Sequence, residues 1–154
     1  MQKRMKLLKN QKGMTLVELL AVLVILGIIA AIAIPMIGNV INDSRDKAIL
    51  ADAQTVLSAA KVAYANGEGT KAINNSKTEI TFNKDVLEPY VEGATLAIGD
   101  KVVYIVEDKS WSITYDDLKN MKKQKKYGLT DADTEKVTTI TATQLNNALE
   151  GTNR

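Results

Sequence analysis

The chain has 154 residues and a formal net charge of +2 at pH 7, from 20 Lys and Arg against 18 Asp and Glu. It has no cysteine and no histidine, which excludes disulfides, thiolate and imidazole metal sites, and the general base used by most hydrolases. This length suits about one domain, so a membrane or targeting segment would leave only a small globular region.

The positive charge is concentrated at the start of the chain. Residues 1–13 carry five basic side chains and no acidic one. Without them, 15 Lys and Arg would face 18 Asp and Glu, a net charge of −3, so the charge of the whole chain is a poor argument for nucleic-acid binding. We interpret this stretch as a basic leader, whose charged residues are Lys3, Arg4, Lys6, Lys9 and Lys12.

An apolar segment follows, from residue 14 to residue 41. As a helix, its 19 residues 16–34 would reach nearly the thickness of a bilayer's hydrocarbon core, ~30 Å at ~1.5 Å per residue. We predict one membrane-spanning helix with a cytoplasmic N-terminus, because most of the flanking basic residues precede it. The run is long for a secretory signal and ends in Ile-Ala-Ile-Pro, so cleavage by ordinary signal peptidase is the weaker interpretation.

Beyond residue 41 the pattern becomes amphipathic. Apolar residues recur at spacings of three and four, which predicts a helix with one buried stripe. No turn signal separates this part from the apolar segment, so we predict a single helix from about Thr15 to Ala65, ended by Asn66-Gly67. The stripe consists of Ile49, Ala53, Val56, Leu57, Ala60 and Tyr64.

The remainder is predicted to be mostly β. A short strand is expected around Ile80 and Phe82, a helical turn at 85–90, and a hairpin of 101–107 with 110–115. Alternation places Trp111, Ile113 and Tyr115 on one face, which we expect to pack against the helical stripe as core.

The end of the chain is expected to hold a strand at 137–141 and a short helix at 145–149. Thr141 and Gln144 have the spacing of a capping box. The predicted fold class is therefore α+β: a long N-terminal α-helix, with a membrane-spanning half and an amphipathic half, packed on a small antiparallel β-sheet.

Glu18 is the residue that points to function. An ionised carboxylate within a spanning helix costs at least a few kcal/mol, so it needs a partner, an interface or a proton. The apolar segment contains no Lys or Arg. If the chain were cut after Gly13, however, Met14 would gain a free amine that can meet the Glu18 carboxylate of a neighbouring subunit.

The string Gly13-Met14-Thr15-Leu16-Val17-Glu18-Leu19-Leu20, continuing through Ala30-Ala31-Ile32-Ala33-Ile34-Pro35, resembles the prepilin signature of type IV pilins and pseudopilins. The resemblance implies that a prepilin peptidase cuts between Gly13 and Met14 and methylates the new amine of Met14. It also implies that Glu18 pairs with that amine during assembly. Gly27 and Pro35 bracket a stretch that such filaments often unwind, and both residues weaken a helix.

The resemblance implies a structural subunit rather than an enzyme, without cofactor or metal. Residues 1–13 would be the cleaved leader, 14–41 the transmembrane and polymerisation helix, and 42–154 the exported head. The subunit would cross the cell membrane once and then join an extracellular pilus, or fimbrium. Its partners would be other copies, the prepilin peptidase, and the assembly platform with its ATPase. Adhesion, twitching motility and DNA uptake stay open as roles of the filament.

Three alternatives stay open. The chain could be a pseudopilin of a type II secretion or competence DNA-uptake system, or a single-pass anchored binding protein that never polymerises. It could also be a nucleic-acid receptor, with phosphates bound by a basic run for which a solvated face is the commoner explanation. That run comprises Lys119, Lys122, Lys123, Lys125 and Lys126.

Asp131, Asp133 and Glu135 alternate like the start of a calcium loop. Lys136 and Ala142 stand where an EF-hand requires Gly and Glu, so we predict no such site.

Overall fold

The computed structural model describes residues 13–130 and 136–151. Helix α1 runs from Leu16 to Ala65, within one residue of the prediction. The chain divides into two units within this helix, one up to Val40 and the other from Ile41 onward.

Helix α1 ends as the sequence predicts, at Asn66-Gly67. Gly67 adopts a left-handed conformation with φ of 79°. Its N–H donates to the carbonyl of Tyr64 at 3.0 Å, and the N–H of Glu68 donates to the carbonyl of Ala63 at 3.0 Å. This pair of bonds is the Schellman motif, which satisfies carbonyls left open at a helix C-terminus. Gly69 then passes so close to Phe82 that a Cβ there would lie 2.8 Å from the ring.

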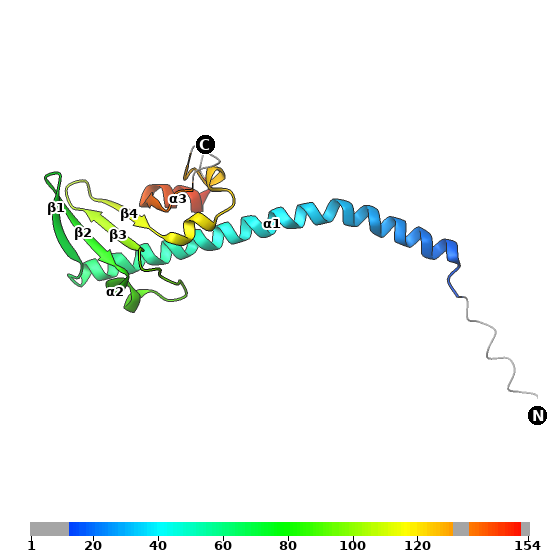
Figure 1. Cartoon of the computed structure of the whole chain (residues 1–154), viewed down its shortest axis with the longest axis horizontal. Coiled ribbons are helices and arrows are strands. Elements are labelled where there is room, and N and C mark those ends of the chain that lie inside the picture. Colours follow the sequence, from blue (N-terminus) through cyan, green and yellow to red (C-terminus); the bar gives the residue numbers. More distant parts are fainter. Residues whose placement is uncertain (1–12, 131–135, 152–154) are drawn as a thin grey trace, which may run out of the picture. The chain divides into compact units, whose positions relative to one another are not determined.

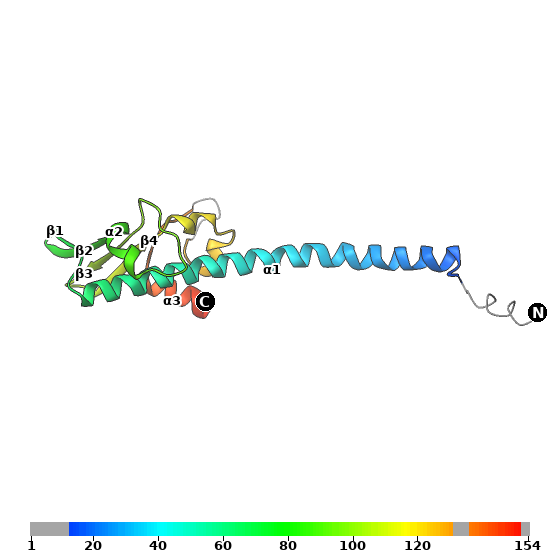
Figure 2. The same cartoon turned by 90° about the horizontal axis from the view of Figure 1, so that it is seen from below.

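The unit from Ile41 onward contains one five-stranded sheet in the order β1-β2-β3-β4-β5, with every neighbouring pair antiparallel. Its strands lie along the second half of α1 (Figures 1 and 2). The α+β prediction is therefore confirmed. The strands are β1 (Thr70–Asn74), β2 (Lys77–Asn83), β3 (Lys101–Ile105), β4 (Ser110–Thr114) and β5 (Thr139–Thr141). The short helices are α2 (Lys84–Leu87), η1 (Glu88–Tyr90), η2 (Asp116–Asn120), η3 (Gln124–Tyr127) and α3 (Ala142–Glu150).

The predicted hairpin is confirmed as β3 and β4, paired with Val102 opposite Ile113 and Tyr104 opposite Trp111. Both strands are shorter than predicted because residues 106–109 form the connecting turn, in which Lys109 has a positive φ of 51°.

Strand β1 was not predicted. All five of its residues are exposed, including Ile73 at 82 %, so it has no alternating pattern of burial. Its backbone pairs with β2 across a tight turn in which Asn75 and Ser76 have φ of 48° and 64°. Two consecutive positive φ values are typical of type I′ hairpin turns, which Asn favours. The Asn-Asn-Ser sequence was therefore the signal for this hairpin.

The end of the described chain matches the capping-box prediction. The Thr141 N–H donates to Gln144 Oε1 at 2.9 Å, and the Gln144 N–H donates to Thr141 Oγ1 at 3.2 Å. The cap starts α3 at Ala142, three residues earlier than predicted, and leaves β5 with three residues instead of five.

The prediction of the buried stripe of α1 is correct at the centre of the stripe and wrong at its ends. Ala53, Val56, Leu57 and Ala60 are buried as predicted, whereas Ile49 is half-buried and Tyr64 is 40 % exposed. The helix turns a slightly different face to the sheet, and this face also buries Leu50, Ala59 and Ala63.

Aromatic rings join the end of α1 to the sheet. Trp111 stacks on Tyr104 at 4.5 Å and on Phe82 at 5.9 Å between ring centroids. Tyr64 meets the Trp111 ring edge-on at 5.8 Å. The predicted packing of the Trp111 face against the helix is confirmed, although Trp111 itself is only partly buried while Ile113 is fully buried.

Every residue of the hydrophobic core lies between Leu50 and Ala148. The unit from Ile41 onward is thus expected to fold independently of the apolar segment.

We predict that Phe82→Ala lowers the free energy of unfolding by about 3–5 kcal/mol, because it empties a fully buried ring position. Ile73→Ala on exposed β1 is the control and should change it by less than about 0.5 kcal/mol. Both are measured by urea unfolding of the chain in detergent, followed by the fluorescence of the single tryptophan, Trp111. Equal effects would contradict this description of the core.

Candidate functional site

The N-terminus of α1 is closed by a capping box that the sequence analysis missed. The Thr15 N–H donates to Glu18 Oε2 at 2.8 Å, and the Thr15 hydroxyl donates to the same oxygen at 3.0 Å. In return, the Glu18 N–H lies 3.3 Å from Thr15 Oγ1. Thr15 and Glu18 have the same spacing as Thr141 and Gln144, so the signal was present in the sequence.

The capping box partly stabilises the Glu18 carboxylate. The carboxylate has hydrogen-bond partners in its own chain and lies at the positive end of the helix dipole, both of which stabilise it. Hydrogen bonds to neutral groups leave the net negative charge uncompensated, however. Among the described residues, none forms an ion pair with Glu18, so a cation is the complement that Glu18 requires in an apolar environment.

Gly13 and Met14 precede the first helical residue and are exposed, Met14 at 64 %. No atom lies within 4 Å of the position that a Cβ on Gly13 would occupy. A peptidase needs non-helical, accessible backbone at the bond it cuts, and the Gly13–Met14 bond meets both conditions.

The apolar segment presents its side chains outward all the way round the helix. Leu16 is 81 % exposed, and all but one of residues 16–41 are exposed; the exception, Ala33, is partly exposed. A helix that is hydrophobic on every side requires an apolar environment. This part of α1 is long and apolar enough to cross a membrane.

Helix α1 is continuous through Gly27 and Pro35. The space around Gly27 is open, with nothing within 4 Å of an added Cβ, and the same is true of Gly38. Neither glycine is required by close packing within the chain. The unwinding expected between Gly27 and Pro35 therefore concerns the packed filament and stays a prediction.

The basic run 119–126 is held against α1 by two acidic residues. The Asp46 carboxylate is 1 % exposed and accepts the backbone N–H groups of Lys122 at 2.8 Å and Lys123 at 2.9 Å. Asp43 lies 2.8 Å from Lys123 Nζ and 2.6 Å from Lys126 Nζ. We call Asp43 and Asp46 with these contacts the acidic clamp.

A buried glutamine holds the same run from the other side. Gln124 Nε2 donates to the carbonyls of Leu118 at 2.6 Å and Val137 at 2.9 Å, and its Oε1 accepts the N–H of Val137 at 3.0 Å. Lys119 pairs with Asp116 at 2.6 Å. Much of the basic run is therefore engaged in holding the fold together.

No cluster of three or more possible metal ligands occurs in the part of the chain that the structure describes. Asp131, Asp133 and Glu135 lie outside the described residues.

Residues 8–34 match the prokaryotic N-terminal methylation motif. No solved structure matches the chain. The N-terminal region is thus a type IV pilin-like class III signal peptide, and its apolar helix together with this motif supports insertion into the membrane.

The acidic clamp predicts a specific response to acid. The ammonium groups of Lys123 and Lys126 lower the pKa of Asp43 from its ordinary value of 3.8 to about 2. A carboxylate with a lowered pKa in the folded state stabilises the fold above its ordinary pKa, and this contribution is lost as the pH falls through about 2. In the Asp43→Asn variant, the free energy of unfolding should therefore fall less steeply between pH 3.8 and about pH 2 than in the unaltered chain. The free energy is measured by urea unfolding at each pH.

Lys126→Gln should reduce the steepness in part, and Lys71→Gln, on exposed β1, should leave it unchanged. An Asp43→Asn variant with the acid response of the unaltered chain would show that the clamp does not contribute.

Proposed function

We propose that this chain is the structural subunit of a type IV pilus, processed by prepilin peptidase and polymerised through its N-terminal helix into an extracellular filament. The observation that carries the proposal is the run of exposed apolar side chains from Leu16 to Ile41, which begins inside the matched methylation motif. A surface of this kind needs lipid or other apolar helices around it. The membrane meets this need before assembly, and neighbouring copies meet it in the filament.

Under this proposal, residues 1–13 are the cleaved leader, 14–41 the transmembrane and polymerisation helix, and 42–154 the exported head. The exposed, non-helical backbone at Gly13 and Met14 supports cleavage at that bond. The placement of every core residue beyond Leu50 supports a head that folds without the apolar helix. The assembly platform and its ATPase would supply the work of moving the apolar helix out of lipid.

Cleavage also creates the cation that Glu18 lacks. The new amine is that of Met14, which is methylated in this proposal and remains positively charged. The capping box supports the pairing because it fixes the Glu18 side chain at the helix N-terminus instead of leaving it free to rotate. Pairing with a neighbouring subunit's amine neutralises both charges in the apolar core of the filament.

Two Glu18 variants and one Thr15 variant distinguish the effect of the Glu18 charge on assembly from the effect of the Thr15–Glu18 capping box. Glu18→Gln keeps an oxygen that can accept the Thr15 N–H but loses the charge. We expect Glu18→Gln and Glu18→Ala each to lower the filament yield by at least about tenfold, because an unpaired amine would enter the apolar core at a cost of several kcal/mol. Thr15→Ala keeps the charge and should have a smaller effect.

The yield is measured by shearing filaments from cells and quantifying the chain in the sheared and membrane fractions. Normal yield from Glu18→Gln would remove the charge pair from the proposal. Abundant long filaments favour a pilin, and only short or transient fibres would favour a pseudopilin.

A matched pair of glycine variants tests unwinding between Gly27 and Pro35. Alanine fits at Gly27 without a clash and should favour the helical state by about 1 kcal/mol. If assembly requires extension there, Gly27→Ala lowers the filament yield while the membrane pool of processed subunit is kept. Gly38→Ala, equally open but outside the bracketed stretch, is the control. Equal filament yields from both variants would contradict unwinding.

A further inference from the structure

The charged residues that follow the apolar segment on α1 face two ways. Asp43 and Asp46 turn to the basic run and form the acidic clamp. Arg45 and Lys47, which alternate with them in sequence, are exposed. The acids of this stretch are thus engaged within the fold, whereas its cations face the surroundings.

A third exposed cation comes from the clamped run itself. Lys122 donates its backbone N–H to Asp46, and the residue is exposed. Within residues 13–130 and 136–151, the side chains of Arg45, Lys47 and Lys122 form no ion pair. We call these three residues the basic collar.

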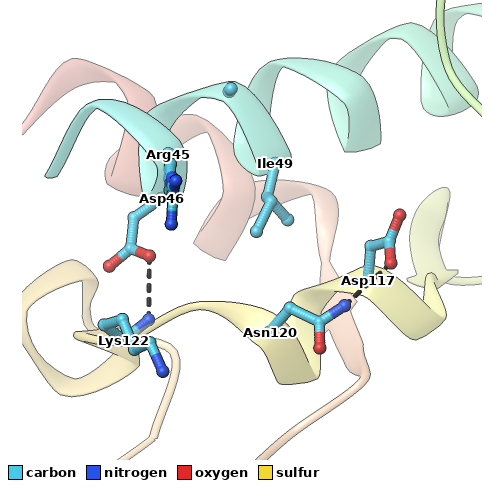
Figure 3. A pocket seen from close by; sticks show the side chains of 7 residues that line it. Arg45, Asp46, Ile49, Asp117, Asn120 and Lys122 are labelled. Atoms are coloured by element: carbon cyan, nitrogen blue, oxygen red, sulfur yellow. Dashed lines mark hydrogen bonds between the residues drawn. The ribbon is translucent and has the colours of Figure 1, made fainter. Parts of the chain in front are cut away.

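Two members of the basic collar border a hollow of about 420 Å³ between α1 and η2. Arg45, Asp46 and Ile49 line it from α1, and Asn120 and Lys122 line it from the facing segment (Figure 3). The remaining lining residues are Ala48 and Asp117, and the Asp117 carboxylate accepts a hydrogen bond from the Asn120 amide at 2.9 Å. The hollow is thus bordered by two cations, Arg45 and Lys122, while the two carboxylates that also line it already accept hydrogen bonds within the fold.

If the apolar segment spans a membrane, the position of the basic collar along the chain puts it within a few residues of the membrane surface. The apolar segment ends at Ile41, so Arg45 follows four residues later, at ~6 Å along a helix. The headgroup layer is ~5–8 Å thick on each side of the hydrocarbon core. Lysine side chains are long enough for Lys47 to reach back into this layer. Lys122 is brought to the same level because its backbone is bound to Asp46.

We propose that, before assembly, the basic collar binds the phosphates of anionic phospholipids in the leaflet that the head faces. Cations next to a membrane are attracted by anionic lipid, and this attraction reaches only about a Debye length. Arg45 and Lys47 project from different sides of α1, which suits a bilayer that surrounds the helix. Nucleic acid fits less well, because none of the residues lining the hollow is aromatic and able to stack on a base.

This inference rests on membrane insertion and not on filament formation. It gives the acidic clamp a role beyond stability, since the clamp holds Lys122 at the level of the lipid phosphates. Leaving the membrane for the filament then requires these contacts to be released.

The test uses the full chain in nanodiscs of phosphatidylcholine with or without phosphatidylglycerol. Hydrogen–deuterium exchange of the 119–127 segment is compared with that of the 70–83 hairpin by mass spectrometry. We expect exchange of 119–127 to slow by at least about threefold with phosphatidylglycerol, and high salt to reverse the effect. The hairpin should not respond.

The triple variant Arg45→Gln, Lys47→Gln, Lys122→Gln should lose the protection. The control triple Lys61→Gln, Lys71→Gln, Lys101→Gln removes the same charge from exposed positions elsewhere and should keep it.

Three results would overturn the proposal. Equal exchange in both kinds of nanodisc would show that anionic lipid is not bound. Equal protection by inorganic phosphate in phosphatidylcholine nanodiscs would indicate a soluble anion as the ligand, and protection by a short DNA duplex but not by phosphatidylglycerol would indicate nucleic acid. Filament yield is independent of these readouts, so failure here is distinguishable from failure of the proposed function.

Discussion

The account depends on one constraint: the first half of α1 exposes apolar side chains in every direction and carries a single carboxylate, Glu18, near its start. Such a surface is stable only in lipid or among similar helices, and the carboxylate is stable there only with a cation. The capping box with Thr15 satisfies the hydrogen bonds of Glu18 and leaves its charge to be neutralised. In the proposed function, cleavage exposes the amine of Met14 and the helix polymerises, and these two events together would meet both requirements.

The unit from Ile41 onward is stabilised by a different set of interactions. Its core combines a stripe of small and branched side chains on α1, one face of the sheet, and buried side chains of the short helices and connecting segments. Just after the apolar segment, α1 contacts the basic run 119–126 through the acidic clamp. The buried Asp46 of this clamp accepts two backbone N–H groups. Asp46 is separated in sequence from Lys122 by 76 positions and from Lys123 by 77, and its hydrogen bonds fix a segment that contains the 3₁₀ helices η2 and η3. Part of the basic run 119–126 therefore stabilises the fold through contacts with α1.

The sequence predicted well the features that rest on periodicity or on local turn chemistry. The bounds of α1 were correct to within one residue, and the pairing of β3 with β4 and the Thr141–Gln144 capping box were correct, although the bounds of β3, β4 and α3 differed from the prediction. Helical spacing, strand alternation and capping-box spacing each have a local cause. Strand β1 was missed because its exposed residues have no apolar pattern to detect. The acidic clamp and the bonds of buried Gln124 were missed because they join residues distant in sequence, and no single-chain pattern connects Asp46 with Lys122. The Thr15–Glu18 capping box was missed although its spacing is readable, because Glu18 lies in an apolar segment where its charge, not its side-chain oxygen, is the more conspicuous property.

The central claim is tested most directly by the intact mass and N-terminal residue of the exported protein. The account predicts a chain that begins at Met14, has lost residues 1–13 and carries a methyl group on its amine. An exported protein that still contains its first thirteen residues would contradict the account, since Glu18 would then lack the amine that cleavage exposes.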